Sequence, residues 1–223
     1  MNLALIAHYA PSLLSGFGVT ILCWAAGGAL GLVLGFAMAL MRRLRVPPLR
    51  WLLRAFIELF RGTPFLMQLF LIYAGGPSFG LRLSATAAGI LGLALYSSAY
   101  FAEIFRAGFA AVPAGQVEAA VSVGMKPFDT MMRVMLPGAL IAAVPAIVNM
   151  LIILSKETVV LSIITVPELM YQVQTVAAET FTAFGAIFAM AVFYWLLVEA
   201  VSRLGARFEA RVTAYLSDER LSA

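Results

Sequence analysis

Residues 107–137, AGFAAVPAGQVEAAVSVGMKPFDTMMRVMLP, lie between two long apolar runs and interrupt them with charged side chains, glycines and prolines. The flanking runs are about 20 residues or longer, which suffices to cross a hydrocarbon core roughly 30 Å thick at about 1.5 Å per residue. A hydrophobic chain that breaks its membrane pattern in this way presents the broken segment to water. We therefore expect residues 107–137 to project from one side of a membrane protein.

The composition indicates an all-α integral membrane protein whose single domain covers residues 1–223. Hydrophobic residues make up 63% of the chain and charged residues 12%, whereas soluble domains are about a quarter charged. The single cysteine and single histidine exclude a disulfide framework and a zinc site of the usual Cys/His spacing. They also leave no Ser/His or Cys/His catalytic pair with its base inside the apolar core. We expect no enzymatic activity, metal or bound cofactor on this chain, and no nucleic-acid partner.

The apolar runs predict five membrane-spanning helices, and the basic residues predict their direction. Lysine and arginine favour the cytoplasmic side, and twelve occur in the connections after the first and third spans and in the tail, against one on the opposite side. The N-terminus is therefore expected outside, and the segment 107–137 and the C-terminus in the cytoplasm. The spans are 13–41, 53–75, 84–106, 138–160 and 184–203; the twelve residues are Arg42, Arg43, Arg45, Arg50, Arg54, Arg106, Lys126, Arg133, Arg203, Arg207, Arg211 and Arg220, and the opposing one is Arg82.

Two features of the predicted helices leave alternatives open. Gly27, Gly31 and Gly35 form a ridge of small residues that either permits close helix packing or reflects the ordinary glycine content of membrane helices. The mildly polar outer stretch 161–183 is expected to form a short helix that lies at the outer surface or dips back toward the core.

The second span carries charged residues on one helical face and a proline beyond them. Arg50, Arg54, Glu58 and Arg61 are spaced four, four and three apart, so they share a face. We expect Arg50 and Arg54 to reach the inner headgroups. Since charge inside a membrane is costly, Glu58 and Arg61 are expected to have a buried, paired role at the inner end of a pathway. Pro64 removes a backbone hydrogen bond and should kink the helix.

The third and fourth spans contain further polar candidates. Glu103 and Arg106 are three residues apart and are expected to pair near the cytoplasmic surface. Lys156 has two alternative roles: its ammonium reaches the outer interface, or it belongs to a polar lining that faces a substrate path or gate. Tyr96, Ser97, Ser98 and Tyr100 form a polar belt that faces water or a neighbouring helix; the candidates for the path are Arg61, Gln68, Asn149, Lys156 and Glu157.

The chain contains no phosphate-binding loop of the Walker type. Its two lysines, Lys126 and Lys156, are followed by proline and glutamate, whereas the loop requires serine or threonine after the lysine. If transport is driven by a nucleotide, the nucleotide site lies on another polypeptide. The segment 107–137 then offers a docking surface, with short helices at 115–123 and 128–135, a turn at Gly124, and Pro137 ending the second helix and starting the next span.

At this point the motifs resemble a known family. Glu118-Ala119-Ala120, Gly124 and Leu136-Pro137 resemble the cytosolic signature of permease subunits in binding-protein-dependent ABC importers, with Val134 where isoleucine is usual. The similarity covers about residues 11–212 and is closest to the polar amino-acid branch, which includes histidine-, glutamine- and arginine-type permeases. That branch is indicated by the blocks 58–64 (ELFRGTP), 99–108 (AYFAEIFRAG) and Gly115-Gln116; Lys156-Glu157-Thr158 also resembles a family block, with Val159 in place of the usual serine.

The resemblance implies a five-helix transmembrane domain of a type I ABC importer in the bacterial inner membrane. It implies that the Glu118 segment is a coupling helix seated in a groove of a separate ATPase subunit, which binds ATP and Mg²⁺. It also implies a second permease subunit, identical or paralogous, an extracytoplasmic solute-binding protein, and polar amino acids or relatives such as opines as substrates. Two alternatives remain from the residues alone: a self-sufficient secondary transporter or channel for small polar solutes, and a small integral-membrane enzyme.

Overall fold

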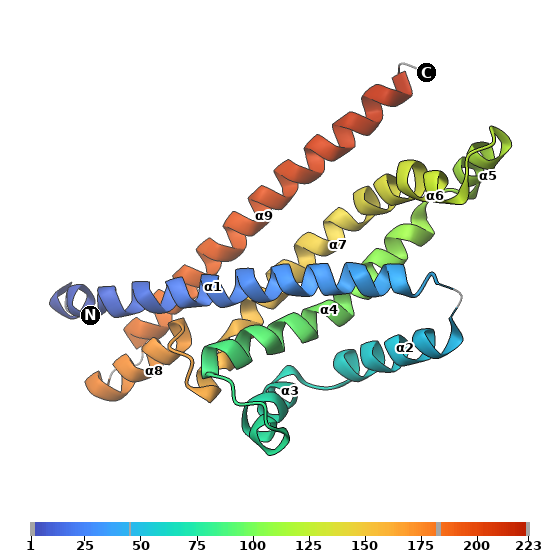
Figure 1. Cartoon of the computed structure of the whole chain (residues 1–223). Helices are drawn as coiled ribbons and strands as arrows, with labels where there is room; N and C mark the ends of the chain where they lie inside the picture. The colour runs from blue at the N-terminus through green and yellow to red at the C-terminus, as the bar shows by residue number, and fades with distance from the viewer. Residues whose placement is uncertain (1–2, 45, 182–183, 222–223) are drawn as a thin grey trace.

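The regular elements of the described chain are all helices (Figure 1). The computed structural model describes residues 3–44, 46–181 and 184–221; Arg45 and the side chains of Arg211 and Arg220 lie outside that description. The α-helices are α1 (Leu3–Met41), α2 (Pro47–Gly62), α3 (Phe65–Phe70), α4 (Ala85–Ala111), α5 (Ala114–Ser122), α6 (Pro127–Thr130), α7 (Leu136–Glu157), α8 (Leu169–Thr180) and α9 (Phe184–Leu221). Wider π turns (Leu71–Gly75, Met131–Met135) and 3₁₀ turns (Gly76–Phe79, Thr158–Ile164) adjoin them.

The helices long and apolar enough to cross a membrane overlap all five predicted spans. The fourth begins at Pro127 rather than at 138, because α6 is continuous with α7, and the other ends differ from the prediction by up to seven residues. Four are continuous, and a fifth consists of two pieces, Pro47–Gly62 and Phe65–Phe79, that meet at an angle of 111°. The continuous ones are His8–Met41, Ala85–Ala111, Pro127–Ile164 and Phe184–Ala210.

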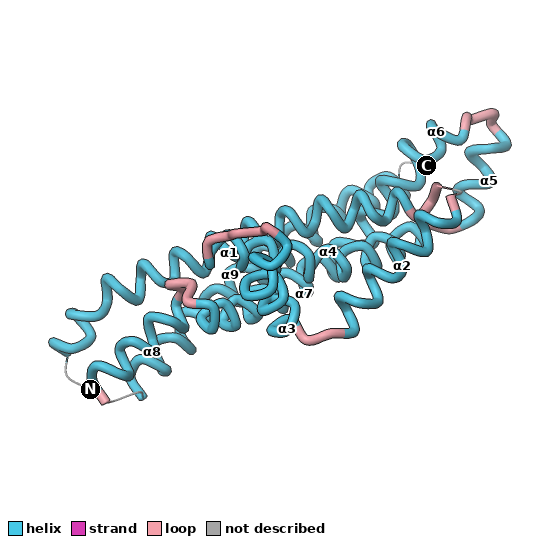
Figure 2. Tube along the Cα trace, turned by 60° about the horizontal axis from the view of Figure 1, so that its bottom comes forward, coloured by secondary structure: helices cyan, strands magenta, loops and turns pink. Residues whose placement is uncertain are grey.

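The glycine ridge of α1 lies against α4, so the prediction of close packing is confirmed. A Cβ atom at Gly27 would lie 2.6 Å from Leu93 Cβ, and one at Gly35 would lie 2.5 Å from Phe101 Cβ. Eight residues further along α1, the contact lies eight residues further along α4, so the two helices run in the same direction. They lie side by side in Figures 1 and 2. Close backbone approach of this kind provides van der Waals packing in a membrane, where lipid tails already solvate apolar side chains.

The serines of the polar belt face this helix contact rather than water. Ser97 and Ser98 are fully buried, and each hydroxyl donates to a carbonyl of its own helix at 2.7 Å, Ser97 to Leu93 O and Ser98 to Leu95 O. A small side chain that satisfies its own hydroxyl can lie beside a glycine without leaving a polar group unpaired.

The second span is broken at Pro64, more severely than the kink predicted. Proline restricts the preceding residue to extended backbone, and Thr63 has φ −118° and ψ 147°. Because Pro64 has no N–H, the carbonyl of Phe60 loses its helical donor. The side chain of Gln68 replaces it: Nε2 lies 2.8 Å from Phe60 O and 3.1 Å from Thr63 O.

The outer stretch forms α8, which packs along the outer part of α1 (Figure 1). A helix of 39 residues is about 58 Å long, well beyond a hydrocarbon core of roughly 30 Å. Part of α1 therefore extends past the lipid, and α8 covers it with Leu169, Val173 and Val176. The stretch thus forms a helix packed against α1, and its depth in the membrane stays a prediction.

The carboxylate of Glu168 begins α8 and ties it to α1. It accepts hydrogen bonds from the backbone N–H groups of Met170 at 2.9 Å and Tyr171 at 2.8 Å, and from the hydroxyl of Thr20 at 3.4 Å. The Glu168 side chain is fully buried. Burial raises its pKa to about 7, because desolvation outweighs the three hydrogen bonds that favour the carboxylate.

We expect the thermal stability of the protein to fall as the pH rises from about 5 to about 8. The pKa of Glu168 is raised from 4.5 to about 7 in the folded protein, so the folded state retains a proton that the unfolded state releases. The associated free energy of unfolding, up to about 3 kcal/mol, is present below the lower value and is lost across this window. Melting temperatures across the range test this. Glu168→Gln should flatten the dependence; an unchanged slope in this variant would contradict the assignment.

Candidate functional site

The segment between α4 and α7 forms a rigid elbow, residues 114–135, at one end of the molecule (Figure 1). Helix α5 ends in a turn that satisfies its last carbonyls: Met125 N donates to Ala120 O at 3.0 Å and Gly124 N donates to Val121 O at 2.9 Å. Gly124 has φ +80°, the left-handed conformation that this helix ending requires and that glycine adopts without strain. The predicted turn at Gly124 is confirmed.

The elbow exposes apolar side chains at its tip. Val121 is 62% exposed, Val123 78% and Phe128 70%. Glu118, Ala119 and Gly124 are also exposed, whereas Ala120 is buried inside the elbow. Apolar side chains clustered in a segment that projects from the bundle are typical of a contact surface.

The second half of the elbow does not end at Pro137, and this corrects the expectation of a separate short helix. Helix α6, the π turn Met131–Met135 and α7 follow one another without a break. Pro137, which has no N–H to donate, follows the wider π turn, in which Leu136 N–H donates to Met131 O. Leu136 and Pro137 therefore lie inside a continuous helical rod, which joins the elbow directly to the spanning part of α7.

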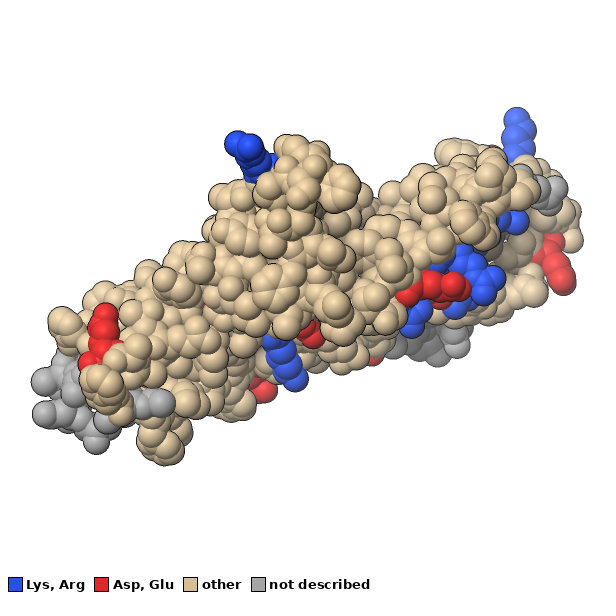
Figure 3. All heavy atoms as spheres, turned by 90° about the horizontal axis from the view of Figure 1, so that it is seen from below, with Lys and Arg blue, Asp and Glu red and all other residues tan. Residues whose placement is uncertain are grey.

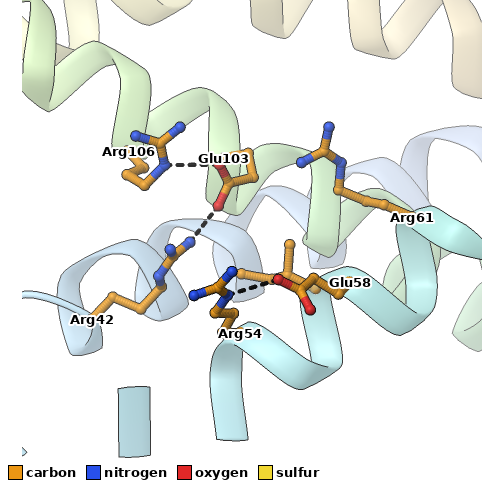
Figure 4. A pocket seen from close by; sticks show the side chains of 7 residues that line it. Arg42, Arg54, Glu58, Arg61, Glu103 and Arg106 are labelled. Atoms are coloured by element: carbon orange, nitrogen blue, oxygen red, sulfur yellow. Dashed lines mark hydrogen bonds and ion pairs between the residues drawn. The ribbon is translucent and has the colours of Figure 1, made fainter. Parts of the chain in front are cut away.

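Charged side chains meet where the C-terminal half of α2 faces the end of α1 and the C-terminal part of α4 (Figure 4). Glu103 forms an ion pair with Arg42 through one carboxylate oxygen and with Arg106 at 2.7 Å through the other. The predicted pair of Glu103 and Arg106 is confirmed. Arg42 was not predicted as a partner of Glu103, because it follows the end of α1 and lies far from Glu103 in the sequence. Its position at the end of the first predicted span was the only sequence signal for this ion pair.

The expectation of a buried, paired role for Glu58 and Arg61 is wrong. Glu58 pairs with Arg54 at 2.7 Å, and the two side chains are 64% and 72% exposed. Residues four apart on a helix meet readily, and this local pair needs no burial. Arg61 instead lies with its guanidinium carbon 5.4 Å from the centre of the Tyr100 ring.

An open cavity of about 570 Å³ lies between the end of α2 and the inner halves of α4 and α7. Arg61 and Tyr100 line one side, and Ala142 and Ala146 of α7 line the other. Asn149 and Lys156 are exposed further along the same stripe of α7, since positions three, four and seven apart share a helical face. The structure thus brings Arg61, Asn149 and Lys156 to one polar face, whereas Glu157 is half-buried beside it.

Gln68 is placed away from this face. Its side chain is 6% exposed and its amide nitrogen is committed to the broken end of α2, so it holds the backbone rather than lining the cavity. Sequence reasoning could have found this role, because a glutamine one turn after a proline is within reach of the carbonyl that the proline leaves unpaired.

Comparisons with known proteins agree with this geometry. A family model described as a binding-protein-dependent transport system inner membrane component matches residues 31–214. A probable glutamine ABC transporter permease of Bacillus subtilis is 35% identical over 91% of this chain and 94% of its own length. An arginine transport system permease and an L-cystine transport system permease of the same organism are 32% and 34% identical, over 91% and 93% of this chain and 93% and 89% of their own lengths.

Solved structures show the same fold. The crystal structure of an amino acid ABC transporter with histidines superposes with a TM-score of 0.89 at 35% identity, covering 95% of this chain and 99% of that one. An inward-facing methionine ABC transporter superposes with a TM-score of 0.72 at 20% identity, covering 94% of this chain and 97% of that one. The second likeness concerns the fold alone.

We expect Gln68→Met to destabilise the protein by about 1–3 kcal/mol, because it leaves the carbonyls of Phe60 and Thr63 without their side-chain donor. The same substitution should cost less in a Pro64→Ala background, where residue 64 regains a backbone N–H. Melting temperatures of the wild type, both single variants and the double variant form the required cycle. An equal cost of Gln68→Met in both backgrounds would show that Gln68 does not replace the bond missing at Pro64.

Proposed function

The chain belongs to the family of inner membrane components of binding-protein-dependent transport systems, and we propose from this premise that its elbow docks the ATPase subunit. The chain is the membrane-spanning permease subunit of an amino-acid ABC importer, and ATP hydrolysis is carried by a separate subunit. Neither a secondary transporter or channel nor a membrane enzyme fits this family. The chain provides the pathway and catalyses no bond chemistry itself.

The exposed apolar tip of the elbow is the observation that carries the docking proposal. Val121, Val123 and Phe128 stand 62–78% exposed on a segment whose backbone is held by the turn at Gly124. Because α6 continues into α7, a push on the tip by the partner moves the spanning helix as one body. Glu118, Ala119, Ala120 and Gly124 form the docking half, and Leu136 and Pro137 transmit the motion into α7.

The unequal basic residues support an orientation with the elbow in the cytoplasm. Arg42, Arg43 and Arg106 lie together at the elbow end of the bundle, as basic residues do on the cytoplasmic side. We place the chain in the bacterial inner membrane with its N-terminus outside. ATP and Mg²⁺ bind the partner subunit, which approaches from the elbow side.

The polar face of Arg61, Asn149 and Lys156 supports a pathway formed by two subunits. These side chains are exposed in the single chain, although charged and amide groups are costly against lipid. A second permease subunit, identical or paralogous, would cover this face and enclose the path. An extracytoplasmic binding protein would deliver the solute to it; the names of the relatives, which include glutamine, arginine and cystine, support a polar amino acid as the substrate.

We expect Gly124→Arg to abolish transport and ATPase coupling while membrane insertion stays intact. An arginine at φ +80° strains the turn and changes the docking surface. Gly80→Arg is the matched control, because Gly80 has the same φ and open space around it but lies in the loop between α3 and α4, away from the elbow. Co-purification with the ATPase subunit and uptake in vesicles measure the effect. Normal uptake by the Gly124→Arg complex would rule out the docking role.

We expect Lys156→Met to change the transport kinetics or the preference among amino acids rather than assembly. The substitution removes a charge from the polar face but keeps most of the side-chain length. Lys156→Arg preserves the charge and should restore much of the wild-type profile. The measurement is competition uptake with a panel of basic, acidic and amide amino acids; identical profiles for all three proteins would leave Lys156 as a residue that reaches the outer interface.

A further inference from the structure

A hollow of about 320 Å³ that the proposed function does not use lies where the C-terminal half of α2 faces the end of α1 and the C-terminal part of α4. Four guanidinium groups and two carboxylates line it, which leaves an excess of two positive charges. Figure 4 shows these side chains converging from the three helices. They are Arg42, Arg54, Arg61, Arg106, Glu58 and Glu103.

The two carboxylates accept hydrogen bonds from only some of the N–H groups of the four arginines. Each guanidinium has five N–H donors, yet Arg42 and Arg106 share the single carboxylate of Glu103. Arg54 has Glu58, and among the described side chains no carboxylate lies within ion-pair distance of Arg61. The paired side chains of Arg42 and Glu103 are only 22% and 21% exposed, whereas those of Arg54 and Arg106 are 72% and 52% exposed. The excess positive charge therefore lies on exposed arginines beside a partly buried ion pair, where it would attract an anion.

Helix α2 also presents a surface for lipid next to the hollow. Around its axis, the charged stripe of Arg54 and Glu58 lies between the buried side and an exposed apolar stripe. That apolar stripe contains Trp51, 72% exposed, and Leu52 and Leu59, each 60% exposed. Tryptophan concentrates at the level of the lipid headgroups, so an exposed Trp51 places the hollow within reach of a headgroup phosphate.

We propose that this hollow binds the phosphate group of an anionic phospholipid, with acyl chains lying along the exposed apolar stripe of α2. Guanidinium forks match phosphate oxygens in pairs, and basic pockets between spanning helices on the cytoplasmic side are suited to anionic headgroups. The choice of the cytoplasmic leaflet rests on the orientation given under the proposed function. A lipid with two phosphate groups would neutralise both excess positive charges. A lipid with a single net negative charge would neutralise only one of them.

The α-carboxylate of a transported amino acid is the competing occupant, because the hollow shares Arg61, Glu103 and Arg106 with the larger cavity. Charge favours the lipid: an amino acid also carries an ammonium group, which four guanidinium groups repel. A bound phosphate would hold these parts of the three helices together. Loss of the lipid should therefore loosen this contact without removing the substrate path.

The experiment counts lipids retained by the purified transporter complex. The complex is reconstituted in nanodiscs of phosphatidylcholine with increasing phosphatidylglycerol, or with a lipid carrying two phosphates, and the retained lipid is measured by native mass spectrometry. Arg54→Gln is expected to weaken retention of the anionic lipid about tenfold, the order of one charge-assisted hydrogen bond. Phosphatidylcholine retention should not change.

Arg203→Gln is the matched control, because Arg203 forms an exposed pair with Glu199 four residues away, as Arg54 does with Glu58. Equal loss of anionic lipid in both variants would indicate general attraction to basic residues and would overturn the proposal. Displacement of the lipid by the transported amino acid would assign the hollow to the substrate path, and binding of soluble glycerol phosphate with no lipid retention would show a free-phosphate site. Both outcomes overturn the lipid assignment.

The Gly124→Arg variant separates this proposal from the docking role. Lipid retention is independent of ATPase docking, so a permease that has lost its ATPase should still hold the anionic lipid. Retention lost in Arg54→Gln but kept in Gly124→Arg is the expected pattern. Loss in Gly124→Arg would mean that the lipid is held by the assembled complex and not by this hollow.

Discussion

The close approach of α1 and α4 is the contact on which the rest of the structure depends. Glycines at four-residue spacing on α1 let the backbones meet in parallel, and this contact fixes the register of two long helices. The register brings Arg42 to Glu103 at one end. At the other end, α1 extends past α4 and receives α8 through Thr20 and Glu168. Without that approach, neither the inner charge cluster nor the outer clamp would form.

The helices are interrupted where the chain changes direction. At each interruption, backbone groups that lose their helical partners form hydrogen bonds with other groups of the chain. Gln68 supplies the donor missing at Pro64, and a left-handed glycine closes α5 at Gly124. Pro64 lies within a candidate span, where a membrane offers no water to a broken helix, so the change of direction there requires such a partner. Gly124 lies in the elbow, outside the candidate spans. At Pro137 the chain instead stays helical. The elbow is therefore separated from α4 by turns but is continuous with α7.

The charged side chains also differ in location and in exposure to water. The hollow near the elbow carries arginines in excess over carboxylates, in line with the proposed cytoplasmic side and the proposed anionic lipid. Asn149 and Lys156 of α7 are exposed, as the proposed path requires. The outer carboxylate of Glu168 is buried among hydrogen-bond donors and holds α8 against α1. The exposure of each set therefore fits the role proposed for it. Arg42 and Glu103 are partly buried, Asn149 and Lys156 are exposed, and Glu168 is fully buried.

The sequence by itself determined the approximate spans, the turn at Gly124, the local pair of Glu103 with Arg106 and the family, whereas the direction of the spans stays a prediction from the basic residues. Each of these features depends either on residues that are close together in the sequence or on the distribution of apolar and charged residues along it. Tertiary structure alone decided that Arg42 joins Glu103 and that Glu58 and Arg61 are not buried together as a pair. The physical reason is that a side chain chooses among partners by distance and burial. Those depend on the angle at Pro64 and on the register of α1 against α4, which local pattern does not encode.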